Sequence, residues 1–198
     1  MAASPNNTLN DDILEQSRYS RMAIWLHWLI ALLIIGQLIG GKIMTWMGPT
    51  SLKFEIYQYH KSIGIMILLL SLLRLGWRLA HKPPALPEGM KAWERRAASL
   101  SHKGFYALMI GIPLSGWAMV SASTFGIKTK LFKTLPWPHI PGVPQSKDLE
   151  TGLKTLHEYL GVLIFLLLAM HIGAALKHHF KDKDDVLTRM IPWIKARK

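Results

Sequence analysis

The sequence predicts an all-α integral membrane protein folded as a four-helix bundle. Half of its 198 residues are hydrophobic, and they gather in runs close to the roughly 20 residues that a helix needs to cross a bilayer. Lys and Arg lie mainly between these runs, as is typical of membrane proteins. Each run also carries a histidine near one of its ends, and imidazole is an unusual side chain inside a membrane.

The charge and the cysteine content exclude several classes of protein and site. The formal net charge is +12, but the basic residues flank apolar runs, so we interpret them as orientation signals. We therefore expect no nucleic-acid partner. The sequence has no cysteine, which excludes disulfides, thiolate metal sites, iron–sulfur clusters and covalently attached c-type haem.

The first span is expected at 22–41, after a polar and partly acidic tail at 1–17 that does not resemble a signal peptide. This run carries no formal charge, and its only strongly polar residues are His27 and Gln37. Trp28 lies near its start, as interfacial aromatic residues do.

Three more spans follow, at 57–80, 102–121 and 153–177. The longest loop lies between the third and the fourth. Residues 18–180 then form one membrane domain, and residues 181–198 form a basic tail.

Four spans place both ends of the chain on one side of the membrane. The N-terminal flank, the second connection and the C-terminal tail hold most of the Lys and Arg. The positive-inside rule then predicts that both termini are cytoplasmic. The outer loop departs from this trend, because it carries Lys128, Lys130 and Lys133. These lysines could attract an anion or simply be solvated.

The fourth span carries two histidines on one face. His157 and His171 are 14 residues apart, which is close to four helical turns and about 21 Å of rise. With the predicted topology, His27 matches the depth of His171 on the cytoplasmic side. His60 matches the depth of His157 on the periplasmic side. The sequence therefore predicts two cross-helix histidine pairs, one in each leaflet.

Bis-histidine ligation of haem iron is the simplest chemistry for these pairs, because an imidazole inside a membrane is costly unless it is paired or bound to a metal. Six-coordinate iron favours electron transfer over oxygen activation. The alternative is that each histidine bonds a nearby carbonyl or fills space in a haem-free transporter or structural bundle. Zinc fits less well, because no span carries the two histidines four residues apart that zinc motifs use.

At these histidines the chain resembles the bacterial cytochrome b561 family, also called the nickel-hydrogenase cytochrome b family. The matching segments are Trp25–Leu29, Tyr59–Ile65, His102–Leu108, Ile112–Trp117, Leu156–Glu158, Met170–Leu176 and Lys177–Met190. The last of these, KHHFKDKDDVLTRM, is the most specific.

The resemblance implies a multi-pass protein of the bacterial inner membrane with two non-covalent b haems between its helices. It implies that the axial ligands are His27 and His171 for the inner iron, and His60 and His157 for the outer iron. It also implies membrane quinone, with ubiquinone expected, as the electron partner on the cytoplasmic side. Some members oxidise superoxide at the periplasmic face and pass the electron to ubiquinone.

Four further residues are candidates for the cytoplasmic side. His178 follows His171 by two turns and matches the family position associated with quinone; His102 could line the quinone pocket or bond a haem propionate. Arg74 and Arg78 could pair with propionates. Each of the four could equally be an ordinary interfacial residue.

The expected function is therefore a di-haem b-type cytochrome that carries electrons between the periplasmic side and the membrane quinone pool. Superoxide oxidation coupled to ubiquinone reduction is its most concrete enzymatic form. Two alternatives remain open. The chain could be a haem-bearing anchor subunit that relays electrons for a separate dehydrogenase, or a bundle without haem.

Overall fold

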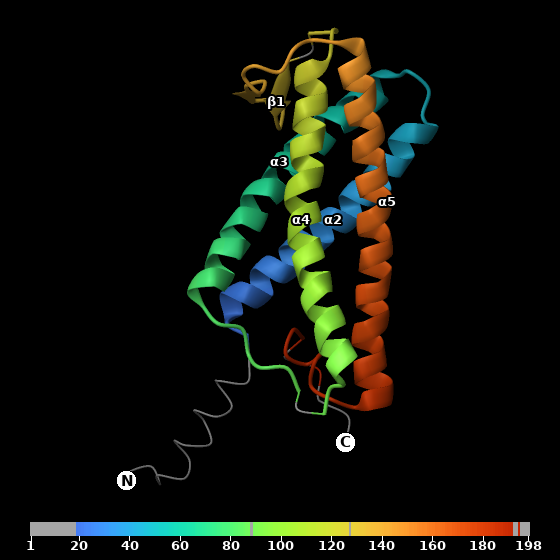
Figure 1. Cartoon of the computed structure of the whole chain (residues 1–198). Coiled ribbons are helices and arrows are strands. Elements are labelled where there is room, and N and C mark those ends of the chain that lie inside the picture. Colours follow the sequence, from blue (N-terminus) through green and yellow to red (C-terminus); the bar gives the residue numbers. More distant parts are fainter. Residues whose placement is uncertain (1–18, 88, 127, 192–193, 195–198) are drawn as a thin grey trace.

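The computed structural model describes residues 19–87, 89–126, 128–191 and 194. The elements, in chain order, are α2 (Arg21–Trp46), α3 (Ser51–Ala80), α4 (Ala92–Ala122), β1 (Thr129–Leu131), β2 (Leu135–Trp137), α5 (Lys147–Lys177) and η1 (His178–Asp182) (Figure 1). Among the described residues, four helices are long and apolar enough to cross a membrane. The predicted all-α membrane fold is confirmed.

The helices are longer than the predicted spans, and the third differs most. It begins at Ala92 and not near residue 102, so His102 lies well inside α4. The backbone N–H of Lys91 donates to Oε2 of Glu94 at 3.0 Å, which satisfies a donor at the helix start. Ser146 accepts from the N–H of Leu149 at 3.4 Å, so α5 begins at Lys147 and not near 153.

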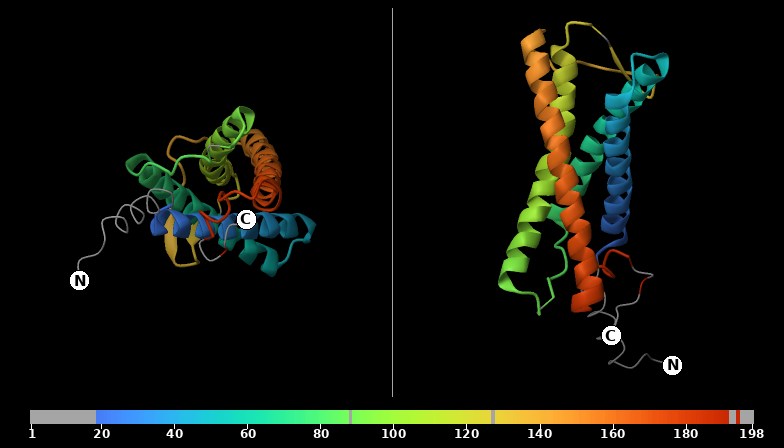
Figure 2. Two further views of the ribbon diagram at one scale, coloured as in Figure 1. Left: turned by 90° about the horizontal axis from the view of Figure 1, so that it is seen from below. Right: turned by 90° about the vertical axis from the view of Figure 1, so that its right-hand side faces the viewer.

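The bundle consists of two helical hairpins that are inclined to each other. Viewed along the bundle, α2 and α3 lie on one side and α4 and α5 on the other (Figure 2). Helix α3 also packs against α4, which joins the two hairpins. Helix α2 begins at the same end of the bundle where α5 finishes, as expected for four antiparallel spans (Figure 1).

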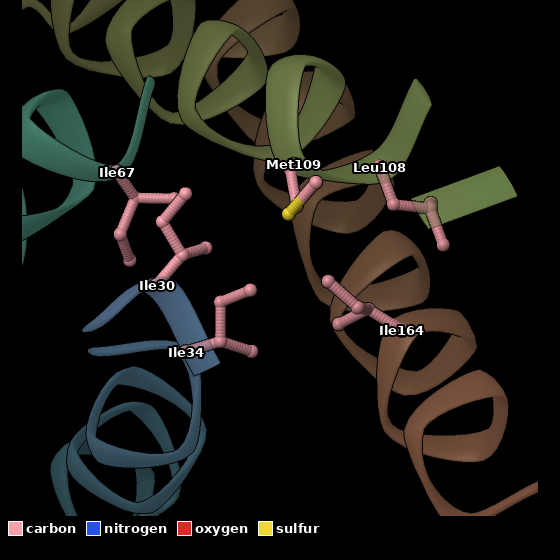
Figure 3. Close-up of a cluster of buried hydrophobic side chains, with 6 residues drawn as sticks. All are labelled: Ile30, Ile34, Ile67, Leu108, Met109 and Ile164. Atoms are coloured by element: carbon pink, nitrogen blue, oxygen red, sulfur yellow. The ribbon is translucent and has the colours of Figure 1, made fainter. Parts of the chain in front are cut away.

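An apolar cluster connects all four helices near the middle of the bundle. Its buried members are Ile30 and Ile34 from α2, Ile67 from α3, Leu108 and Met109 from α4, and Ile164 from α5 (Figure 3). Ile164 lies seven residues from both His157 and His171. The cluster therefore separates the two predicted histidine layers with a dry, tightly packed layer.

The loop between α4 and α5 contains a short β-hairpin that was not predicted from the sequence. Strands β1 and β2 pair antiparallel, and Phe132 and Lys133 turn between them with positive φ. The N–H of Phe132 donates to Oγ of Ser62 at 2.9 Å, and Ser62 is only 1% exposed. Lys133 pairs with Glu55 at 3.1 Å. These contacts fix the hairpin against α3, next to His60.

We expect Ser62→Ala to release this hairpin, because the amide of Phe132 loses the hydroxyl that accepts its hydrogen bond while the helices keep their own bonds. Hydrogen exchange of residues 129–137 should become several-fold faster. The matched control is Thr151→Ala, whose hydroxyl bonds the carbonyl of Lys147 within α5. Unchanged exchange in Ser62→Ala would show that the hairpin is held by other contacts.

Candidate metal centres at two histidine pairs

The structure brings the predicted inner pair together from the first and the last helix. The ring centres of His27 on α2 and His171 on α5 are 6.2 Å apart, and the ring planes are inclined by 60°. Phe105 from α4 packs edge-on against His171, with ring centres 5.2 Å apart. The two imidazoles are therefore held facing each other without stacking.

The outer pair has the same spacing. His60 on α3 and His157 on α5 have ring centres 6.2 Å apart, and their ring planes are inclined by 73°. One helix, α5, thus contributes to both pairs, while α2 and α3 contribute one histidine each. The sequence predicted this pairing from depth alone.

The spacing of both pairs suits a metal ion between the rings. Bonds from imidazole nitrogen to first-row metals are about 2 Å long, and a ring centre lies about 1 Å behind its nitrogen, so two rings on opposite sides of one ion have centres about 6 Å apart. Direct ring stacking would require a shorter distance and near-parallel planes. Two inward-facing imidazoles at this distance are therefore fit to be axial ligands of haem iron.

Helix α4 holds His157 in one tautomer. Nδ1 of His157 lies 3.0 Å from the carbonyl oxygen of Ile112 and 2.9 Å from Oγ of Ser115. A carbonyl only accepts, so Nδ1 carries the proton and donates. The other ring nitrogen then keeps a free lone pair, which is the state that a metal ligand needs.

Glycine allows α4 to approach this ring. A Cβ at Gly116 would lie 3.1 Å from Cε1 of His157, which is too close for a ring already fixed by two hydrogen bonds. On the opposite side, a Cβ at Gly41 would lie 3.6 Å from Cε1 of His60, which is ordinary contact. Gly116 is therefore the more restrictive of the two positions.

His60 is positioned through its backbone. Nε2 of Gln37 donates to the carbonyl oxygen of His60 at 2.7 Å, which ties α2 to α3 at the outer pair. Nδ1 of His60 is buried and has no hydrogen-bond partner among the described residues. A buried polar atom without a partner is costly, and a metal ion would satisfy this atom only if it were bound at Nδ1 itself.

Two arginines lie in the half of α3 that is nearer the inner pair, and Arg74 is the one of the two that contacts this pair. Nη2 of Arg74 lies 3.3 Å from Nδ1 of His27, and its guanidinium lies over the ring of Tyr106. Arginine only donates, so in this arrangement Nδ1 of His27 accepts and the proton lies on Nε2. A metal ion bound at Nε2 would displace this proton, and the neutral ring would then carry its proton on Nδ1. Nδ1 could no longer accept from Arg74, so metal binding through Nε2 requires Arg74 to leave this contact. Arg78 lines a cavity beside His102.

His178 lies at the end of α5 and is bonded to two carboxylates. Its Nδ1 is 2.6 Å from Oδ2 of Asp184 and 3.2 Å from Oδ2 of Asp182. Lys177 joins Asp182 to Glu94, each at 2.7 Å, which connects the end of α5 to the first turn of α4. No role for Asp184 was predicted from the sequence, since nothing in its spacing indicates that the chain turns back to His178.

Part of the predicted basic tail packs against the bundle. Trp28 donates through its indole N–H to the carbonyl oxygen of Met190 at 2.8 Å. Arg189 bonds the carbonyl oxygen of Ala85 in the connection between α3 and α4. The described part of the tail therefore closes the end of the bundle at which the inner pair lies.

Four membrane helices that hold facing imidazoles between them define a membrane protein of the b-type cytochrome class. Residues 18–193 match the family described as prokaryotic cytochrome b561. The chain belongs to this family, whose members bind b-type haem and take part in electron transport.

Relatives from two bacterial species are similar to the chain over nearly their whole length. "Cytochrome b561 homolog 1" of Escherichia coli strain K12 is 29% identical over 89% of this chain and 98% of the relative. "Cytochrome b561 homolog 2" of the same strain is 31% identical over 88% of this chain and 91% of the relative. "Probable superoxide oxidase CybB" of Yersinia pestis is 30% identical over 88% of this chain and 96% of the relative.

We expect Gly116→Ala to disturb haem binding, because the new methyl group meets a ring that two hydrogen bonds prevent from moving. The reduced-minus-oxidised spectrum should show a shifted or weakened band, and haem content per protein should fall. The control is Gly111→Ala in the same helix, where a Cβ meets nothing within 4 Å. Equal spectra for both variants would contradict the close packing at His157.

Proposed function

We propose that this protein binds two b haems and carries electrons across the membrane between a periplasmic reactant and quinone. The observation that carries the proposal is the pair of equal 6.2 Å histidine spacings. Both pairs share α5, on which their histidines are 14 residues apart, or about 21 Å of helical rise. The haems, when bound, supply one-electron transfer at two depths.

The side chains around the pairs support this role. His27 with His171, and His60 with His157, hold the cofactors, while the apolar cluster around Ile164 excludes water between the layers. Arg74 is placed to pair with a propionate once it leaves His27, and Arg78 lies one turn further on. The basic residues at the α2 start and the α5 end favour cytoplasmic termini, which makes the His60 pair periplasmic.

Superoxide is the proposed periplasmic reactant, and quinone the proposed acceptor. The relative from Yersinia pestis carries superoxide oxidase in its name. In the balanced reaction, two superoxide anions each lose one electron and become two molecules of dioxygen. Quinone takes the two electrons together with two protons and becomes quinol. Lys128 and Lys130 are exposed near the outer pair and would attract the anion, whereas Lys133 is paired with Glu55.

Quinone is proposed to react on the cytoplasmic side, near the His27 pair. His102 is the histidine that lies beside this pair, with its ring centre 6.2 Å from that of His171. His178 lies two turns beyond His171, where its bond to Asp184 could keep one ring nitrogen free for a quinone carbonyl. Both residues remain candidates for quinone contact.

The test is superoxide-driven quinone reduction by the purified, haem-loaded protein. We expect quinol to form at a rate well above background, with one quinol for every two superoxide anions. Added superoxide dismutase should abolish the signal, and the same preparation without protein sets the background.

A rate equal to background would retire the superoxide reaction. If quinol nevertheless reduced the haems, the protein would remain a quinone-linked cytochrome with another partner. If neither superoxide nor quinol exchanged electrons with the protein, the proposed function would be wrong.

A further inference from the structure

A cavity of about 290 Å³ opens between α3 and α4 at the end of the bundle where the inner histidine pair lies. Residues three or four positions apart share one face of a helix, and the lining follows this spacing on both helices. The lining residues that carry the argument are Leu75, Arg78 and Leu79 of α3, and His102, Lys103 and Tyr106 of α4. The cavity therefore lies between one face of each helix.

The cavity lies near the depth at which a membrane protein meets lipid headgroups. Arg78 is in the last turn of α3, which ends at Ala80. Trp93, in the first turn of α4, is 63% exposed, as interfacial aromatic residues are. Leu79 is 80% exposed, and Leu72, further into the span, is about half exposed. The α3 side of the cavity is therefore next to acyl chains, and its polar groups are close to the headgroups.

Two cations line the cavity without a carboxylate to balance them. Among the described residues, neither Arg78 nor Lys103 forms an ion pair. No Asp or Glu is present among the described residues of the lining. Glu94, the acidic residue in the first turn of α4, is bonded to Lys177 at 2.7 Å instead. An anion would therefore neutralise charge that the bundle itself leaves unpaired.

The neutral polar groups of the lining can also donate hydrogen bonds. The hydroxyls of Ser99 and Tyr106 and a ring N–H of His102 can each donate to an oxygen atom. Oxygen atoms of a phosphodiester only accept, and both guanidinium and ammonium groups bind them well. A headgroup that adds an amine finds no carboxylate in the described lining. A phosphodiester with an uncharged alcohol, such as glycerol, therefore fits better than a zwitterionic headgroup.

We propose that this cavity binds the phosphodiester of an anionic phospholipid, with Arg78 and Lys103 as the charged contacts and the acyl chains along Leu75 and Leu79. Basic pockets between membrane-spanning helices are known to hold such headgroups. The bound lipid connects α3 to α4, and so connects the two helical hairpins, next to the inner histidine pair. The inference does not depend on which molecules exchange electrons with the protein.

The test measures how tightly the first lipid binds to the purified, haem-loaded protein, by native mass spectrometry in detergent. Dioleoylphosphatidylglycerol is the probe, and dioleoylphosphatidylcholine, which has the same chains and no net charge, is the comparison. We expect phosphatidylglycerol to bind at least about tenfold more tightly, because two basic residues meet its negative charge. Excess inorganic phosphate should not displace it, because a free ion lacks the chains that contact Leu75 and Leu79.

Three glutamine variants separate the cavity from the basic surface around it. Lys103→Gln removes a charge of the lining, whereas Arg96→Gln removes an exposed charge of the same helix outside the lining. We expect Lys103→Gln to weaken phosphatidylglycerol binding about fivefold, the effect of one basic residue at an anionic lipid, and Arg96→Gln to change it less than about twofold. Arg78→Gln should weaken binding at least as much as Lys103→Gln and keep the wild-type haem spectrum.

Four outcomes would overturn the proposal. Equal affinity for the two lipids would show that the cavity does not recognise the negative charge. Equal weakening in Lys103→Gln and Arg96→Gln would assign the binding to the general basic surface. Displacement by inorganic phosphate would assign the site to a free anion. A changed haem spectrum in Arg78→Gln with wild-type lipid affinity would assign Arg78 to a haem propionate. None of these outcomes affects the proposed electron transfer, which the superoxide assay tests separately.

Discussion

Helix α5 presents a side chain to the bundle interior at every seventh residue, and the rest of the structure is arranged around that row. His157, Ile164 and His171 follow one another at this spacing, and His178 continues it. Seven residues are close to two turns, so the row stays on one face. An imidazole exposed to lipid would be costly, so this face must point inward. The opposite face of α5 can then remain apolar and meet the membrane.

Helix α3 carries a corresponding row, with His60, Ile67 and Arg74 at the same interval. The two rows place a polar layer at each end of the bundle and an isoleucine layer between them (Figure 3). The ring centres are 6.2 Å apart in both histidine layers. The two hairpins are inclined to each other, and all four helices meet at the cluster (Figure 1).

The two ends of the bundle are closed by different means. At the outer end, the β-hairpin bonds Ser62 and lies over α3 beside His60. At the inner end, Lys177 and Asp184 fix the last turns of α5, and Met190 returns to Trp28. These closures limit water at both histidine layers.

The four spans and the histidine pairs could be predicted from the sequence. The bilayer thickness fixes the length of a span, and the helical rise per residue then gives the depth of each histidine in the membrane. The predicted helix starts were too late in the chain, because apolar content marks only the segment of a helix that lies in lipid. The helical turns outside the lipid carry no such signal. Ser146, followed by Asp148 and Glu150, is a recognisable start signal for α5. The contact of the 129–137 hairpin with Ser62 and the fit of Gly116 to His157 depend on residues distant in sequence, which no local pattern shows. The return of Asp184 to His178 depends on the π-helical turn between them.

The pairing of the four histidines is the central claim, and haem content in single variants tests it most directly. His27→Ala and His171→Ala should each lose one of two haems and leave the same residual spectrum. His60→Ala and His157→Ala should also lose one haem each and share a second, different residual spectrum. A residual spectrum shared by His27→Ala and His157→Ala, or the loss of both haems in every variant, would contradict the account.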